Sequence, residues 1–219
     1  MKVVSNTAVS LDGRINTREG GFHFLGSARD HARMSALRAQ ADAVLVGGAT
    51  FRNWPHPSLP DPADRDRLAG QPWNVVVSRR LDVPLTPEFL AEPGIRPLFL
   101  TRAGAVPEGF AAEVEAWDGP GTDLPIPWIL DVLRQRGVRL LLVEAGGDLL
   151  FQFLAADALD EVFVTLCPLV IGGVAPSLMG GPGFTWLAVR RLRLLACEPQ
   201  GDEIFLHYEA LRPAAPAAG

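Results

Sequence analysis

The sequence predicts an α/β protein with a substantially parallel sheet, and three observations support this fold class. Short runs of β-branched residues or leucine alternate along the chain with segments of helical periodicity. Two of these runs, residues 43–46 and 140–143, are continuously apolar, as expected for strands buried on both faces. The composition, 48% hydrophobic and 21% charged among 219 residues, is typical of a globular protein. We expect a single domain over residues 1–212 and a flexible tail over residues 213–219.

The first half of the chain is predicted to contain one long helix between short strands. Residues 3–9 form the first strand candidate, which ends in the turn Ser10-Leu11-Asp12-Gly13. Ser27 is the expected N-cap of a helix that turns Met34, Leu37 and Ala41 toward the core. Further strands are expected at residues 43–46, 73–78 and 97–101, with a loop rich in proline and aspartate at residues 54–70.

The second half alternates more regularly. An amphipathic helix is expected at residues 126–136, a strand at 139–143, a helix from 148 to about 156 and a strand at 160–166. Residues 162–189 carry no charge, but their glycines and prolines exclude a membrane-spanning helix, so we interpret them as a buried strand and a well-covered loop. Strands at 187–197 and 203–209 are expected to close the sheet as an antiparallel pair, joined by a turn at 199–202.

Charge and cysteine content exclude several functional classes. With 20 basic and 25 acidic residues, the net charge of −5 offers no basic surface, and we expect no nucleic-acid partner. The N-terminus becomes polar too early for a signal peptide, which favours a cytoplasmic location without a membrane partner. Cys167 and Cys197 lie in apolar segments without a second cysteine or a histidine at ligand spacing. We therefore interpret both as small core residues.

A glycine pair follows each of the two buried strands. Gly47-Gly48 comes directly after residues 43–46, and Gly146-Gly147 comes two residues after residues 140–143. Glycine lets the backbone approach a ligand, and the N-terminus of a following helix offers N–H groups to an anion. Neither pair matches G-x-G-x-x-G or a P-loop, and either pair alone is compatible with a tight turn. Because the carboxyl ends of parallel strands meet in a crevice, the two pairs together indicate a ligand site. Thr50 either caps a short helix or hydrogen-bonds a cofactor.

Several segments, taken in order, resemble the reductase domain of the riboflavin-biosynthesis deaminase-reductase. They are Ser10-Leu11-Asp12-Gly13-Arg14-Ile15, residues 38–50, residues 143–150 and residues 159–173. The resemblance covers about residues 3–208. It implies a dihydrofolate-reductase-like fold with a mixed, mostly parallel central sheet flanked by helices. It also implies NADPH as cofactor, a homodimer, and reduction of a ribosylamino-pyrimidine phosphate by hydride transfer to C1′ of the opened ribose. The zinc-deaminase signature is absent from the sequence, so no metal is expected.

The resemblance also assigns candidate site residues. The cofactor-binding positions are Ala8, Thr50, Ser78, Gly146, Gly147, Asp148, Leu149 and Leu150. Arg79 and Arg80 follow Ser78, where a guanidinium can pair with a 2′-phosphate and select NADPH; a solvated arginine pair is the alternative.

On the substrate side, the resemblance assigns Arg38 and Glu144, and Glu144 is a candidate catalytic residue as well. The alternative for Glu144 is a charge satisfied by N–H groups at the start of a helix. Asp12 is the second catalytic candidate, or else it only shapes its turn.

One segment departs from the bacterial pattern, in which the threonine is followed by Asp-Asp-Pro and by Leu-x-x-Arg, whose arginine holds the substrate 5′-phosphate. Here the chain reads Thr50-Phe51-Arg52-Asn53-Trp54-Pro55, and Arg52, Arg65 and Arg67 are candidate replacements for that arginine. Two alternatives therefore remain: a dihydrofolate-reductase-like reductase of another pterin or pyrimidine, and a non-catalytic NADP(H)-binding module. His23, His31 and His56 have no catalytic partner in the sequence, and we expect solvated or structural roles for them.

Overall fold

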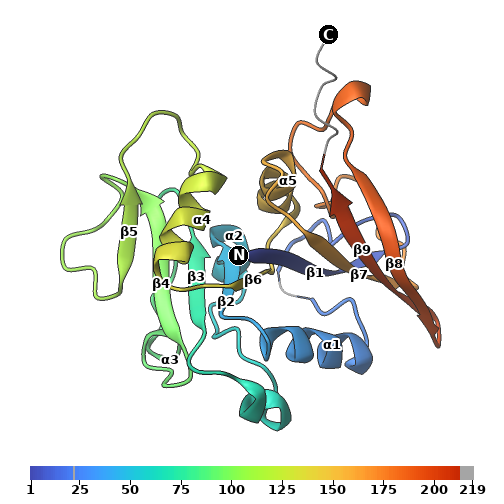
Figure 1. The fold of residues 1–219 in the computed structure, drawn as a ribbon, viewed down its shortest axis with the longest axis horizontal. Coiled ribbons are helices and arrows are strands. Elements are labelled where there is room, and N and C mark those ends of the chain that lie inside the picture. The colour runs from blue at the N-terminus through green and yellow to red at the C-terminus, as the bar shows by residue number, and fades with distance from the viewer. Residues whose placement is uncertain (22, 213–219) are drawn as a thin grey trace.

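The computed structural model describes residues 1–21 and 23–212, and the predicted tail lies outside them. The strands are β1 (Lys2–Ser10), β2 (Ala43–Gly47), β3 (Trp73–Val77), β4 (Arg96–Arg102), β5 (Val114–Trp117), β6 (Leu140–Val143), β7 (Glu161–Cys167), β8 (Arg191–Gln200) and β9 (Glu203–Leu211). Within this part of the chain they form a nine-stranded sheet in the order β5-β4-β3-β2-β6-β1-β7-β9-β8 (Figure 1). Neighbours from β5 to β7 are parallel, whereas β9 is antiparallel to both β7 and β8. The predicted fold class is confirmed.

Helices cover both faces of the sheet. They are α1 (Ala28–Arg38), α2 (Gly48–Asn53), α3 (Pro87–Leu90), α4 (Ile126–Gln135) and α5 (Gly147–Ala155), with short 3₁₀ helices η1 (Pro62–Arg67) and η2 (Trp186–Ala188). Helices α4 and α5 pack on one face, where Ile129 and Phe153 share a core cluster with Leu45. On the other face, Phe51 of α2 packs with Val76, and α3 joins the same cluster. This two-sided burial explains the continuously apolar strands.

The central strand β6 is short, and the sheet opens where it ends. Its last residue, Val143, pairs with Ser5 of β1 on one side and with Leu45 of β2 on the other. Both neighbours run further, β1 to Ser10 and β2 to Gly47. A gap therefore lies between the ends of β1 and β2, and the chain enters it as the turn from β6 into α5.

The C-terminal hairpin is shifted from its predicted bounds. Leu187 belongs to η2, and β8 begins only at Arg191. Pro199 and Gln200 still belong to β8, so the turn contains only Gly201 and Asp202, and Gly201 has a φ of +59°. The prediction missed β5, a four-residue edge strand that carries Glu115 and is too short for a clear alternation of polar and apolar residues.

The inward face of α1 is more polar than predicted. Met34 and Leu37 are half-buried, whereas Asp30 and Ser35 are the buried residues of the helix. Asp30 accepts a hydrogen bond from the buried Thr165 hydroxyl of β7, and Ser35 donates to Asp64. Leu37 still packs against the core cluster that contains the buried Ala41, as predicted, whereas Met34 is only half-buried.

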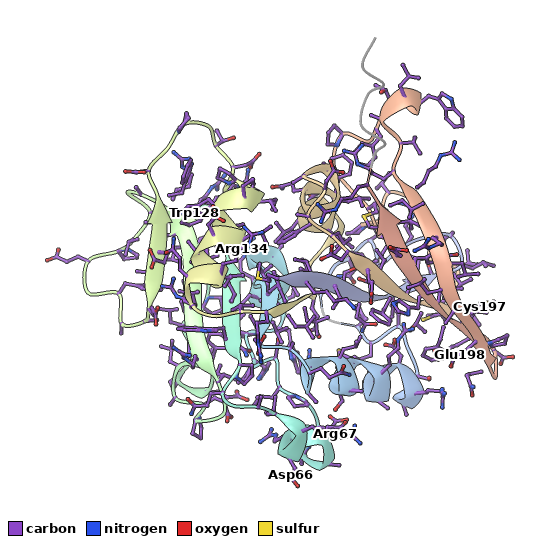
Figure 2. The ribbon with its side chains drawn as sticks, in the orientation of Figure 1. Asp66, Arg67, Trp128, Arg134, Cys197 and Glu198 are labelled. Atoms are coloured by element: carbon purple, nitrogen blue, oxygen red, sulfur yellow. The ribbon has the colours of Figure 1, made fainter. Side chains whose placement is uncertain are left out.

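Two burial predictions for the C-terminal region are wrong. Cys167 is buried, and burial raises the pKa of its thiol to about 11, but Cys197 is exposed near the end of β8 (Figure 2). The segment after β7 is not well covered, because Val174 and Leu187 are more than nine-tenths exposed. β8 forms the sheet edge, and almost all of its residues are exposed. Among the described helices, none has the length and apolar character needed to cross a membrane.

Candidate active site

A cleft of about 1810 Å³ opens at the carboxyl ends of the parallel strands. The gap above β6 forms its centre, with Asn6 and Ala8 of β1 on one side and Gly47 of β2 on the other. The cleft is larger than the ~300–1,000 Å³ that a single small ligand occupies. It therefore has room for two reactants at once.

Most of the predicted cofactor residues line this cleft: Ala8, Thr50, Ser78, Arg79, Arg80, Gly146, Gly147, Asp148 and Leu149. Leu150 is the exception, because its side chain is 1% exposed and belongs to the main core cluster. Its side chain packs into the core because successive residues of a helix point in different directions, and a cofactor contact at this position stays a prediction.

The two glycines at the start of α5 have different surroundings. Gly146 is the N-cap, and a Cβ added to it meets no atom within 4 Å. A Cβ on Gly147 would lie 2.1 Å from the carbonyl oxygen of Ser177 and 2.8 Å from the nitrogen of Gly180. Of the two glycines predicted to bind the cofactor, only Gly146 has open space beside it.

A segment far along the chain lies against the start of α5. We call residues 171–182 the cover segment, because Ser177 and Gly180 lie against Gly147, and several residues of the segment line the cleft. Asp148 holds this segment, since its carboxylate accepts the N–H of Gly181 at 2.9 Å. The cover segment and the N-terminus of α5 thus form one wall, where helix N–H groups favour an anion.

The turn between β2 and α2 forms the opposite wall. Helix α2 begins at Gly48 with Gly47 as its N-cap, so Thr50 lies inside the helix and does not cap it. Thr50 lines the cleft, and its cofactor contact stays a prediction. Nearby, the carboxylate of Asp82 accepts hydrogen bonds from Ser78 at 3.2 Å and from Arg52 at 2.9 Å.

The two arginines after β3 are not equivalent. Arg79 pairs with Asp123 at 2.8 Å, and both side chains are exposed. Arg80 is also exposed and lines the cleft, and it has no hydrogen-bond or ion-pair partner among residues 1–21 and 23–212. Arg80 is therefore the guanidinium that is available to a ligand phosphate.

Arg38 and Glu144 meet at the floor of the cleft. Arg38 Nε donates to Glu144 Oε1 at 2.8 Å and Arg38 Nη2 donates to Oε2 at 2.6 Å, a two-bond pair whose side chains are 17% and 12% exposed. Burial by itself would lower the pKa of Arg38, but the Glu144 carboxylate outweighs it and the pKa is raised. Arg38 also donates to the carbonyl of Leu59 at 3.0 Å, which fixes the pair against the loop before η1.

Asp12 is not among the described residues that line the cleft. Its carboxylate accepts hydrogen bonds from the Ser10 hydroxyl at 2.7 Å and from the N–H groups of Ile171 and Gly172 at 3.0 and 2.7 Å. These bonds lower the pKa of Asp12 to about 2. The geometry favours the loop-shaping alternative, extended to a second loop, and the catalytic role of Asp12 stays a prediction.

Another part of the cleft lining is rich in aromatic rings. Phe24 lies 4.3 Å from His31 and 6.3 Å from Trp54, and Trp54 lies 4.2 Å from His56, measured between ring centroids. All four line the cleft, as does His23. Of the three arginines considered for the substrate phosphate, Arg52 and Arg65 line the cleft, whereas Arg67 points outward on η1 and pairs with Asp64 (Figure 2).

Sequence reasoning missed Asn6. This residue of β1 is 7% exposed and lines the cleft, and its Oδ1 atom is buried without a hydrogen-bond partner in the described chain. A buried acceptor without a partner indicates that a ligand donates a hydrogen bond to it. An amide side chain inside an apolar strand, two residues before Ala8 and thus on the same side of β1, was the available signal.

No group of three histidine, cysteine, aspartate or glutamate side chains is placed to hold a metal ion among the residues described here.

Comparisons with known proteins agree with this geometry. The family model "RibD C-terminal domain" matches residues 1–206. The 2,5-diamino-6-ribosylamino-4(3H)-pyrimidinone 5′-phosphate reductase of Methanothermobacter thermautotrophicus is 30% identical, with 94% of this chain and 96% of the relative covered. The protein of the same name from Archaeoglobus fulgidus is 29% identical, with 83% and 87% covered.

A solved structure supports the fold. The pyrimidine reductase-like protein of Corynebacterium diphtheriae superposes with a TM-score of 0.79 at 22% identity, covering 97% of this chain and 92% of that one. Membership of this reductase family implies a nicotinamide cofactor. Since the family model covers nearly the whole chain, this protein belongs to the RibD C-terminal domain family.

Proposed function

We propose that this protein is an NADPH-dependent reductase of a ribosylamino-pyrimidine 5′-phosphate in riboflavin biosynthesis. Two relatives that it matches over most of their length carry the name of that reductase. The observation in the structure that carries the proposal is the single cleft. It joins an open helix N-terminus at Gly146 to the buried Arg38–Glu144 pair.

The cofactor fits the wall formed by α5, the cover segment and α2. Its pyrophosphate would lie at the N-terminus of α5, where Gly146 leaves open space and the first N–H groups of the helix have no intrahelical acceptor. Arg80 would pair with the 2′-phosphate, because Arg79 is already neutralised by Asp123. The unpartnered Asn6 amide would bond the cofactor or substrate at the centre of the cleft. When bound, the cofactor supplies the hydride.

The chain itself contributes orientation. Arg38 holds both carboxylate oxygens of Glu144, and each oxygen keeps acceptor capacity for hydroxyl or amino groups of the substrate. This arrangement fixes the substrate against the cofactor wall, so that C1′ of the opened ribose can receive the hydride. Holding two reactants in one geometry supplies much of the rate enhancement of such a reaction.

The direct test follows oxidation of NADPH by its near-ultraviolet absorbance when the purified protein receives the ribosylaminopyrimidine phosphate. We expect turnover and a ribitylamino product. Cofactor binding without turnover of this substrate would contradict the substrate assignment and leave a reductase of another pterin or pyrimidine.

The altered segment after Thr50 favours testing the non-catalytic module as well. A ligand at 100 times its dissociation constant stabilises a protein by about 2.7 kcal/mol, which a thermal shift detects. Stabilisation by NADPH together with stabilisation by the substrate supports the reductase. Stabilisation by NADPH alone favours the binding module.

We also propose that the protein is a homodimer. Trp186 and Leu187 of η2 are 86% and 97% exposed, and β8 at the sheet edge exposes Leu192, Leu194 and Leu195. Several large apolar side chains exposed in one region of the chain are typical of protein interfaces. Light scattering should give twice the chain mass of 23.6 kDa, and Leu194→Asp should reduce it to the monomer value. A monomeric wild type would contradict the proposal.

A further inference from the structure

The turn after β1 and the cover segment are held together along much of their length. Beyond its bonds to Asp12, the cover segment receives two hydrogen bonds from Arg14: Nη1 donates to the carbonyl of Ala175 at 2.8 Å and Nη2 to that of Gly173 at 2.6 Å. Backbone bonds continue the contact, from Ile15 N–H to the Pro176 carbonyl and from Leu178 N–H to the Gly13 carbonyl.

The other end of the cover segment is held by α5. Asp148 accepts the Gly181 N–H, and the backbone of Ser177 and Gly180 fits closely against Gly147. The segment is thus attached at both ends, and its middle, including Val174 and Pro176, lines the cleft beside the open Gly146 position.

We propose that Asp12 is a positioning residue for the cofactor: through Ile171 and Gly172 it fixes the cover segment as the wall beside the N-terminus of α5. Asp12 itself does not line the cleft, so its effect on a ligand must pass through this segment. The inference rests on the proposed cofactor site.

An ionised carboxylate suits this position. Asp12 receives three donors, and one carboxylate can accept all of them without offering a donor in return. Hydrogen bonds to the charged form lower the pKa of the group to about 2, which leaves no proton to donate at neutral pH. An asparagine at this position would present an NH₂ group to one of these donors, so Asp12→Asn tests the charge and Asp12→Ala tests the whole contact.

The first measurement is amide hydrogen exchange on the protein without cofactor. Asp12→Ala and Asp12→Asn should raise exchange in residues 171–181, with the larger increase for alanine. Asp131→Asn is the matched control, because Asp131 forms an exposed ion pair with Arg134 on α4. If both Asp12 variants show unchanged exchange in the cover segment, the inference is wrong. This result does not depend on any ligand, because the protein is measured without cofactor.

The second measurement compares NADPH affinity with turnover at saturating NADPH. Loss of charge-assisted hydrogen bonds predicts that the dissociation constant rises roughly tenfold or more in Asp12→Ala. The rate at saturating cofactor should stay within about threefold of wild type, because the reacting groups remain in place.

The outcomes separate this inference from the proposed function. A wild type that binds no NADPH contradicts the proposed function. A wild type that binds, with Asp12→Ala binding equally well, contradicts only the positioning role. A large loss of turnover at saturating NADPH would mean that Asp12 acts on the reaction directly, and the positioning role would be withdrawn.

Discussion

The two glycine turns that enter the cleft are built alike and covered differently. In both, the first glycine is the N-cap in extended conformation without a side-chain capping bond, and the second begins a helix. A Cβ on Gly48 would lie 3.0 Å from side-chain atoms of Ser78. A Cβ on Gly147 would lie far closer to backbone atoms of the cover segment.

This difference separates the roles of the glycines. A neighbouring side chain can adjust by a small rotation, whereas a backbone held at both ends cannot. We therefore expect the β2–α2 turn to tolerate substitution. In the β6–α5 turn, Gly147 is required by close packing, whereas Gly146 has open space beside it.

The largest effects are expected for valine at the two glycines before Asp148. Gly147→Val should yield little folded protein, because its Cβ would overlap the Ser177 carbonyl. Gly146→Val should fold with an unchanged melting temperature and lose NADPH affinity roughly 100-fold or more, since its side chain enters the space of the pyrophosphate. Melting temperature and cofactor titration on both variants check this. A folded Gly146→Val with normal affinity would mean that the cofactor binds elsewhere.

Glu144 has no counterpart in the other turn, and its removal is expected to have the next largest effect. Glu144→Ala leaves the mostly buried Arg38 guanidinium unpaired and should cost about 3 kcal/mol of unfolding free energy. The double variant Arg38→Leu, Glu144→Leu should recover most of that stability but none of the activity. Denaturant unfolding measures the first effect and an NADPH oxidation assay the second. Activity in the double variant would exclude a substrate role for the pair.

Arg80, next to the β2–α2 turn, tests cofactor selection. Arg80→Ala should weaken NADPH by about 10- to 150-fold, the value of a charge-assisted contact of about 1.5–3 kcal/mol, and leave NADH nearly unchanged. Arg79→Ala is the matched control and should change NADPH affinity much less, because Asp123 already pairs with Arg79. The measurement is the dissociation constant of NADPH and of NADH for each variant. Equal weakening of NADPH and NADH would contradict 2′-phosphate recognition.

A milder substitution compares the turns directly. Gly48→Ala should change the unfolding free energy by less than about 1 kcal/mol, because tight contact with Ser78 offsets the better helix propensity of alanine. Gly147→Ala should cost several times more, because its close neighbour is a backbone carbonyl. Equal costs in parallel denaturant titrations would show that the cover segment moves as easily as a side chain.

The smallest effect concerns acid. Because the folded-state pKa of Asp12 is lowered from 3.8 to about 2, its carboxylate stabilises the fold above pH 3.8, and this contribution is lost as the pH falls toward 2. Asp12→Asn should lack this part of the acid dependence. Melting curves of both proteins across that range should converge as the pH falls. Parallel curves would show that Asp12 makes no folded-state bonds in solution.

Local patterns were enough to predict most of the sheet and the position of the cleft. The apolar run of β2 and the glycines that follow it identify a buried strand and its ligand-facing end without any distant information. Arg38 and Glu144 came from the family resemblance, and the structure brings them into direct contact. Their roles toward the substrate stay predictions.

The features that sequence could not supply depend on distant neighbours. Gly147 is constrained by Ser177, thirty positions later, and nothing near Gly147 records that contact. Cys197 looks like a core residue locally, but its exposure follows from the position of β8 at the sheet edge. The burial of the Leu150 side chain is different, because its spacing from Phe153 and Leu154 already indicates a core face.

The early end of β6 has a consequence for how this fold can change. The cleft exists because β6 stops at Val143 while β1 and β2 continue. The volume of the cleft therefore depends on the length of β6 and not on the chemistry of the lining residues. Two further ladder-forming residues in β6 would close the site, whereas substitutions around it alter only which molecules are accepted. Such an architecture lets new substrates be accepted on an unchanged scaffold, through lining residues such as Phe24 and Trp54.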